Sequence, residues 1–169
     1  MKTQWYALYT RPKFEKKVEQ RLQEAGFESW LPLQTVIRQW SDRKKKIEVP
    51  LFNGYIFVRT HSKQLYHAVQ TDGVATVVTF NGVPAPIREE QIEMIRKILV
   101  GPDAFDVIDR KFTRGEPVKI VEGPLKGNTG KWLDWRGSKR VCLEVEQLNH
   151  VFLVEVPAPY IEKVKSCSE

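Results

Sequence analysis

Apolar residues recur along the first hundred residues with the periods of strands and helices. Residues 5–9 form an apolar run that is typical of a buried strand. Apolar residues then recur at spacings of four, four and three, which predicts a helix over residues 13–25. They are Phe14, Val18, Leu22 and Ala25. Gly26 follows at the position where helices commonly end.

Shorter segments complete this first part of the chain. Strands are predicted over residues 27–31, 34–40, 44–49, within 50–58 and over 74–80, with further helices over 62–71 and 89–100. Ser41-Asp42-Arg43 has the composition of a hairpin turn between the second and third of these strands. Ser62 is expected to cap the helix that it begins.

From Thr113 onwards the pattern consists only of short strands and tight turns. Strands are predicted over residues 118–121, 129–134, 140–145 and 151–156. Glycine, proline and asparagine separate them at intervals of about ten residues, as in a small barrel or sandwich. Residues 101–112 show no strong period. The sequence therefore predicts an α+β protein with an α/β domain over residues 1–100, a linker over 101–112 and an all-β domain over 113–169.

Positive charge is concentrated in the first domain. The net charge of the 169-residue chain is +6. Residues 1–100 contain 16 Lys and Arg against 10 Asp and Glu, whereas residues 101–169 contain 11 of each kind. The net positive charge of the first domain favours binding to nucleic acid or to an acidic protein surface. The second domain has no net charge that would attract it to either.

The composition argues against several classes of protein. The two cysteines, Cys142 and Cys167, are too few for a disulfide framework or a zinc site, and the three histidines fall in unrelated contexts. No nucleophile–base set or phosphate loop can be assembled, so we expect neither an enzyme nor a bound metal or cofactor. No apolar run is long enough to span a membrane and the start does not resemble a secretory signal, which predicts a cytoplasmic protein.

Glycines and inward apolar residues alternate in the second domain. The pattern consists of Gly115, Val118, Ile120, Gly123, Pro124, Leu125, Gly127 and Gly130. It resembles the KOW motif of ribosomal proteins and NusG-type elongation factors, which implies a small SH3-like β-barrel. Some KOW barrels bind RNA and others bind protein.

The first domain resembles the NusG N-terminal domain, an α/β sandwich. The resemblance rests on Trp5-Tyr6, on residues 50–58 and on Pro84-Ala85-Pro86-Ile87. Together the two resemblances cover nearly the whole chain in the family's order. The length and the segment 38–46 are closer to specialised paralogues, such as the RfaH type and the capsular-polysaccharide antiterminators of Bacteroides-like bacteria. Asn53 stands where the family usually has proline, and an asparagine can still form that turn.

The NusG resemblance implies a partner and a binding site for the first domain. The family's N-terminal domain docks on the clamp helices of the largest catalytic subunit of RNA polymerase. By position, Tyr9, Phe52 and Tyr55 would line the apolar pocket that makes this contact. Aromatic anchors commonly dominate interface energy, although aromatic residues in such a sheet can also be core. The implied function is a transcription elongation or antitermination factor that suppresses pausing or termination.

The predicted hairpin is basic at its tip. Its cationic residues are Arg38, Arg43, Lys44, Lys45 and Lys46. The resemblance implies that they face upstream DNA or the displaced non-template strand, whereas charge runs are more commonly solvated turns. Trp40 beside them could stack on an unpaired base or belong to the core.

Leu125 is expected at the tip of the loop from Gly123 to Gly127. In family members this apolar tip contacts a small-subunit ribosomal protein or the termination factor Rho, so the KOW domain would recruit a second protein to a monomeric factor. The alternative is an RNA-binding or ribosome-associated KOW protein. Such a barrel should itself be basic, and this one is neutral, which favours the polymerase-bound factor.

Overall fold

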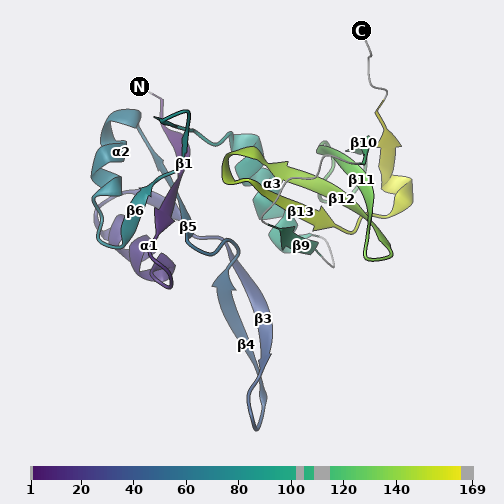
Figure 1. The fold of residues 1–169 in the computed structure, drawn as a ribbon, viewed down its shortest axis with the longest axis horizontal. Helices are drawn as coiled ribbons and strands as arrows, with labels where there is room; N and C mark the ends of the chain where they lie inside the picture. Colours follow the sequence, from purple (N-terminus) through teal and green to yellow (C-terminus); the bar gives the residue numbers. More distant parts are fainter. Residues whose placement is uncertain (1, 102–104, 109–114, 165–169) are drawn as a thin grey trace. The chain divides into compact units, whose positions relative to one another are not determined.

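The computed structural model describes residues 2–101, 105–108 and 115–164 (Figure 1). The contacts within the chain divide it into an N-terminal unit, residues 1–89, and a C-terminal unit, residues 90–169. In the described part of the chain, no helix is both long and apolar enough to cross a membrane.

The N-terminal unit is built on a four-stranded antiparallel sheet in the order β2-β5-β1-β6. The strands are β1 (Gln4–Thr10), β2 (Glu28–Trp30), β5 (Tyr55–Thr60) and β6 (Val74–Val77). The helices are α1 (Glu15–Glu24) and α2 (Ser62–Val69), which lie on the same side of this sheet in Figure 1.

The core of the N-terminal unit lies between this sheet and its two helices. Side chains of alternate residues on β1 and β5 meet the apolar stripes of α1 and α2 in one cluster. Its buried members are Tyr6, Leu8, Val18, Leu22, Leu31, Ile56, Val58, Leu65 and Ala68. Because strand side chains alternate between faces, Trp5, Tyr9 and Phe57 belong to the opposite face of the sheet. The sequence period thus determines which aromatic residues the helices cover.

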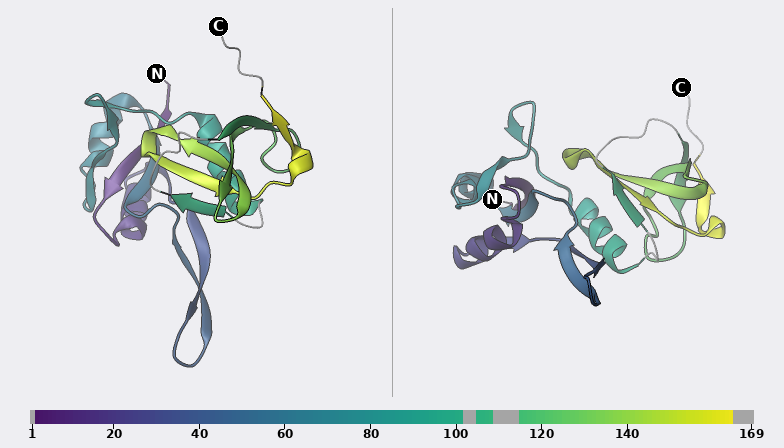
Figure 2. Two further views of the ribbon diagram at one scale, coloured as in Figure 1. Left: turned by 45° about the vertical axis from the view of Figure 1, so that its right-hand side comes forward. Right: turned by 60° about the horizontal axis from the view of Figure 1, so that its bottom comes forward.

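Two β-hairpins extend from the four-stranded sheet. The longer one pairs β3 (Leu33–Gln39) with β4 (Lys44–Pro50) and projects well beyond the rest of its unit (Figures 1 and 2). The shorter one pairs β7 (Thr79–Phe80) with β8 (Val83–Pro84) through Asn81-Gly82, both with positive φ. This turn is the one that an Asn-Gly pair predicts.

The C-terminal unit consists of one α-helix and a six-stranded antiparallel sheet in the order β14-β10-β11-β12-β13-β9. The helix is α3 (Glu89–Val100), and the strands are β9 (Phe105–Ile108), β10 (Glu116–Ile120), β11 (Thr129–Trp135), β12 (Ser138–Val145), β13 (His150–Val154) and β14 (Ile161–Lys163). Two short 3-10 helices, η1 (Glu146–Leu148) and η2 (Ala158–Tyr160), join the last three strands. Cys142, Val151 and Leu153 form a buried cluster with Ile108, Leu133 and Trp135 packed against it.

Most predicted elements are confirmed, and several details differ. The strand predicted over residues 74–80 is divided at Val78 into β6 of the four-stranded sheet and β7 of the short hairpin, whose partner β8 has no counterpart among the predicted strands. Ser62 is the first helical residue and makes no capping bond, because His61 takes the extended backbone of the cap position. Part of the predicted linker is strand: β9 pairs with β13, and the rest of the linker, apart from Gly101, lies outside the described residues. The contacts group α3 from its second residue, Glu90, with the C-terminal unit, whereas the predicted first domain includes the whole helix. Strand β14 was not predicted, because its three residues carry no alternation that a single sequence reveals.

Candidate functional site

Tyr9 and Tyr55 form an accessible aromatic pair at the end of the N-terminal sheet. They are direct cross-strand partners in the β1–β5 register. Their ring centroids are 4.8 Å apart with the planes inclined by 45°. Tyr9 is 37% exposed and Tyr55 is half-buried. The pair therefore offers apolar area and two hydroxyl groups on the sheet face that α1 and α2 do not cover.

Phe52 is not part of this accessible surface. Its side chain is 1% exposed and meets the Phe57 ring edge-on, with 6.1 Å between the centroids. Trp30 stacks on Phe57 with its centroid 5.6 Å away. Phe52 is therefore buried rather than accessible, and its role in binding polymerase stays a prediction. It packs against Phe57 on the sheet face that also carries Tyr9 and Tyr55, where its apolar ring is removed from water.

All five cationic residues predicted at the hairpin are exposed. The β3–β4 register pairs Arg38 with Lys45, and the backbone N–H of Trp40 donates to the carbonyl of Arg43 at 2.8 Å. Since alternate residues share a face, Arg38, Trp40, Arg43 and Lys45 lie on one face of the ribbon. Lys44 and Lys46 lie on the other face, with Ile37. Trp40 is 55% exposed, so the interpretation of Trp40 as a core residue is wrong.

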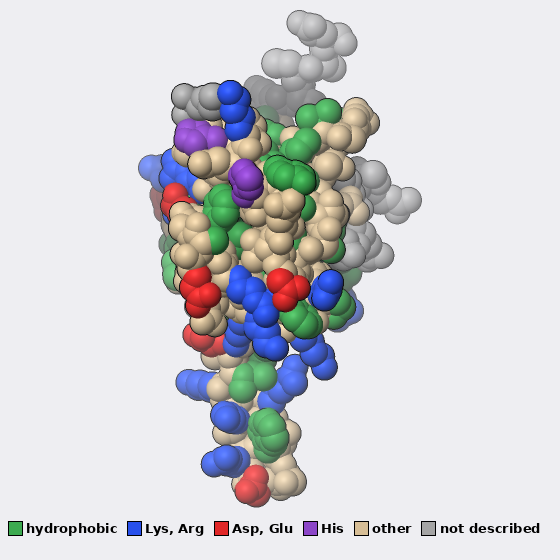
Figure 3. Space-filling view, turned by 90° about the vertical axis from the view of Figure 1, so that its left-hand side faces the viewer, with side chains coloured by type: hydrophobic (Ala, Val, Ile, Leu, Met, Phe, Trp, Pro, Cys, Tyr) green, Lys and Arg blue, Asp and Glu red, His purple; other side chains and the backbone are tan. Residues whose placement is uncertain are grey.

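The first turn of α1 is connected to the base of the hairpin. Lys16 Nζ donates a hydrogen bond to the carbonyl oxygen of Glu48 at 3.0 Å. The backbone N–H of Leu51 donates to the carbonyl of Pro32 at 2.9 Å and closes the base of the hairpin. Figure 3 shows Lys and Arg side chains along the hairpin and above its base. The cationic surface is thus held at one end and extends into solvent at the other.

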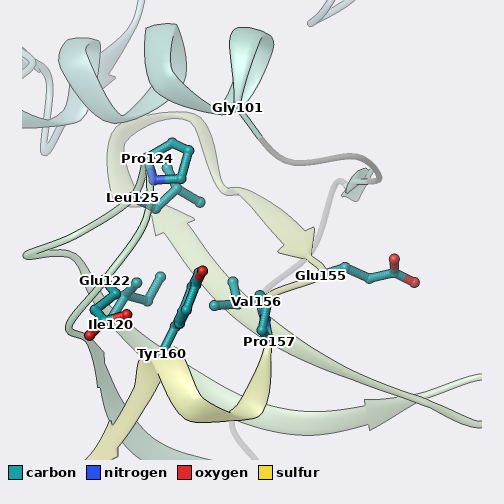
Figure 4. A pocket seen from close by; sticks show the side chains of 9 residues that line it. All are labelled: Gly101, Ile120, Glu122, Pro124, Leu125, Glu155, Val156, Pro157 and Tyr160. Carbon is teal, nitrogen blue, oxygen red and sulfur yellow. The ribbon is translucent and has the colours of Figure 1, made fainter.

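The C-terminal unit contains a small pocket of about 130 Å³. It is lined by Gly101, Ile120, Glu122, Pro124, Leu125, Glu155, Val156, Pro157 and Tyr160. In Figure 4 the Tyr160 ring stands between the Ile120 side and Val156, while the Glu155 carboxylate points away from the ring. Glu155 Oε1 lies 3.1 Å from Arg140 Nη2 in an ion pair.

Leu125 is buried rather than exposed at a loop tip. Only 3% of its surface is accessible. Two hydrogen bonds hold the loop in a compact turn. The backbone N–H of Gly127 donates to the carbonyl oxygen of Ile120 at 2.8 Å, and the side-chain amide of Asn128 donates to the carbonyl oxygen of Leu125 at 2.9 Å. The expected exposure is therefore wrong, and the role of Leu125 in binding a partner stays a prediction. Tyr160 was not among the predicted site residues; an aromatic residue directly after Pro157-Ala158-Pro159 was the available signal.

The described part of the chain contains no group of three or more His, Cys, Asp or Glu side chains placed to hold a metal ion. Burial, together with the Glu144 carboxylate, raises the pKa of the Cys142 thiol to about 11, so this thiol stays protonated at neutral pH.

Comparisons with known proteins agree with this architecture. The family model described as "Transcription termination factor nusG" matches residues 3–96. A protein of Streptococcus pyogenes serotype M3 named "Transcription termination/antitermination protein NusG" is 29% identical over 149 residues, which cover 80% of this chain and 82% of the relative. The protein of the same name from Haemophilus influenzae is 24% identical and covers 96% of this chain and 95% of the relative.

A solved structure shows the same fold. The structure titled "Domain interaction in Thermotoga maritima NusG" matches with a TM-score of 0.55 and 22% identity, covering 98% of this chain and 99% of the other. At this identity the likeness concerns the fold alone.

Proposed function

Because the chain belongs to the NusG family of transcription termination and antitermination factors, we propose that it binds a transcribing RNA polymerase through its N-terminal unit and suppresses pausing or termination. The observation that carries this proposal is the Tyr9–Tyr55 pair, an exposed aromatic contact at 4.8 Å on the sheet face that α1 and α2 leave uncovered. Anchors of this kind usually supply most of the energy of a protein interface. The polymerase surface would be the apolar one on the clamp helices.

The hairpin would make a secondary contact with upstream or non-template DNA. Its cationic residues are all exposed, and none of them forms a salt bridge with another described residue. Exposed Lys and Arg bind phosphates and release counterions. The exposed Trp40 ring adds a surface on which an unpaired base can stack.

The C-terminal unit would recruit a second protein, for which a small-subunit ribosomal protein or Rho is the family's precedent. Its pocket is lined mainly by apolar side chains, with Tyr160 beside Ile120 and Val156. Such a pocket fits one apolar side chain of a partner, and Glu122 at its edge favours a cation next to that side chain. This arrangement supports a protein partner over RNA, because a carboxylate at the site would repel phosphate.

The polymerase contact is tested with the full-length chain carrying Tyr9→Ala and Tyr55→Ala together. We expect capture by transcribing polymerase complexes to weaken at least about tenfold, because two interface anchors are removed. The matched control is Phe80→Ala with Val83→Ala, which removes apolar side chains that are 72% and 64% exposed on the short hairpin. Equal capture of the wild type and the tyrosine variant, with both folded by circular dichroism, would exclude the assignment.

A further inference from the structure

The turn that leads into β5 is held by hydrogen bonds to both backbone groups of one residue, Gly54. Gly54 has a φ of +80°, a conformation that glycine adopts without strain. Its N–H donates to Glu15 Oε1 at 2.9 Å, and its carbonyl oxygen accepts from the backbone N–H of Thr10 at 2.9 Å. Tyr55 is the next residue, and Tyr9 is the residue before Thr10. The two bonds therefore fasten the chain immediately beyond the aromatic pair, where β1 ends and β5 begins.

The Glu15 carboxylate is unusual in this protein. Its side chain is 6% exposed, whereas every other Asp, Glu, Lys and Arg whose side chain the structure describes is at least partly exposed. Burying a carboxylate costs free energy unless hydrogen bonds and positive potential compensate for it. Both are present here, because Glu15 lies in the first turn of α1, at the positive end of the helix, and accepts the Gly54 amide.

We infer that Glu15 is a positioning residue for the polymerase contact. It fixes the Gly54 turn and thereby keeps the Tyr55 ring against Tyr9 before any partner arrives. This inference rests on the proposed function, in which the aromatic pair is the anchor. An interface that is already ordered in the free protein loses less entropy on binding, so its affinity is higher at equal contact area.

The same helix provides a matched control. Glu19 Oε1 accepts a hydrogen bond from the backbone N–H of Leu31 at 3.2 Å, one turn further along α1. This bond also joins a carboxylate of α1 to a backbone amide of the N-terminal unit. It reaches the end of β2, however, and not the turn that carries Tyr55. Glu19→Ala therefore removes a similar stabilising bond while leaving the aromatic pair in place.

The binding experiment compares the full-length wild type with Glu15→Ala, Glu15→Gln and Glu19→Ala, well below the melting temperature of each variant. We expect Glu15→Ala to raise the Kd for transcribing polymerase complexes at least about tenfold. Glu15→Gln should stay within about threefold of the wild type, because its amide oxygen can accept the Gly54 N–H. If Glu19→Ala weakens binding as much as Glu15→Ala, the role of Glu15 is purely structural and the inference is wrong.

A second measurement tests the positioning without polymerase. NMR of the free full-length chain reports the hydrogen exchange of the Gly54 amide and the contacts between the two tyrosine rings. Glu15→Ala should accelerate that exchange and weaken the ring contacts, whereas Glu15→Gln and Glu19→Ala should not. Unchanged exchange and ring contacts in Glu15→Ala would overturn the inference. If the wild type does not bind polymerase, the proposed function fails, and these NMR data alone decide whether Glu15 positions the pair.

Discussion

Tyr9, Tyr55 and Phe52 lie near one another in the fold and differ in exposure. Tyr9 is 37% exposed and Phe52 is 1% exposed. The tyrosine hydroxyl tolerates water at the rim of a sheet, whereas the Phe52 ring has no polar atom and packs edge-on against Phe57. The predicted anchor set therefore divides into two accessible residues and one buried residue.

This division predicts different consequences for two alanine substitutions. Phe52→Ala should lower the free energy of unfolding by about 3–5 kcal/mol, because it leaves a cavity beside Phe57. Tyr55→Ala should cost clearly less stability, because Tyr55 is already half-exposed. Urea unfolding of the full-length variants, followed by tryptophan fluorescence, measures both. A Phe52→Ala cost below about 1 kcal/mol would mean that the Phe52 ring is not part of the core.

The hairpin is the element with the clearest division of faces. One face carries Arg38 and Lys45, and the other carries Lys44 and Lys46. Trp40 and Arg43 directly follow and precede the two strands, and the alternation of side chains places them on the face of Arg38 and Lys45. A nucleic acid that uses both phosphate contact and base stacking should prefer the face with the tryptophan. Because side chains alternate between the two faces of the hairpin, the run of cations is divided into two faces of different composition.

This preference is testable with charge-matched pairs. Arg38→Ala with Lys45→Ala and Lys44→Ala with Lys46→Ala each remove two positive charges, so each should reduce the salt dependence of single-stranded DNA binding by a similar amount. We expect the first pair to weaken binding at least about fivefold more, because it borders the Trp40 ring. Fluorescence anisotropy with the full-length chain measures the affinity. Equal losses would show that the number of charges alone matters.

In the whole molecule, the two units differ in net charge. Residues 1–89 contain 14 Lys and Arg against 8 Asp and Glu, and residues 90–169 contain 13 of each. The whole positive excess therefore lies in the unit that carries the hairpin. A neutral second unit attracts phosphate weakly, which leaves its apolar pocket free for a protein partner.

The two functional hypotheses differ in which cations should bind RNA. If the C-terminal unit is an RNA-binding KOW domain, its own cations should matter more than those of the hairpin; we expect the reverse. Replacing Arg38, Arg43, Lys44, Lys45 and Lys46 with alanine should lower the affinity of the full-length chain for RNA at least about tenfold and flatten its salt dependence. The matched control replaces five exposed cations of the C-terminal unit, Lys119, Lys126, Arg136, Lys139 and Lys163. A larger loss from the control set would favour the RNA-binding alternative. Filter binding at several salt concentrations distinguishes the two outcomes.

Local sequence patterns were enough to locate most helices and strands and the concentration of positive charge. Local periods of 3.6 and 2 residues predict α1, the two strands of the long hairpin and most strands of the second unit. Such periodicity can be recognised without knowledge of any tertiary contact. Family resemblance to NusG, confirmed by the comparisons, also rests on sequence alone. The exposure of the hairpin cations was predictable as well, because long charged side chains rarely lose their water.

The accessibility of the predicted site residues, in contrast, depends on the folded arrangement of the chain. Phe52 and Leu125 are apolar residues of turns, and whether such a side chain faces water depends on how the chain around it folds. Phe52 meets Phe57 in the following strand, and Leu125 lines a pocket with Tyr160, which lies much further along the chain. The Glu15–Gly54 bond joins residues 39 positions apart, and strand β9 is defined by its pairing with β13. Contacts of this kind leave no periodic trace in a single sequence, because each joins two segments whose distance along the chain is arbitrary.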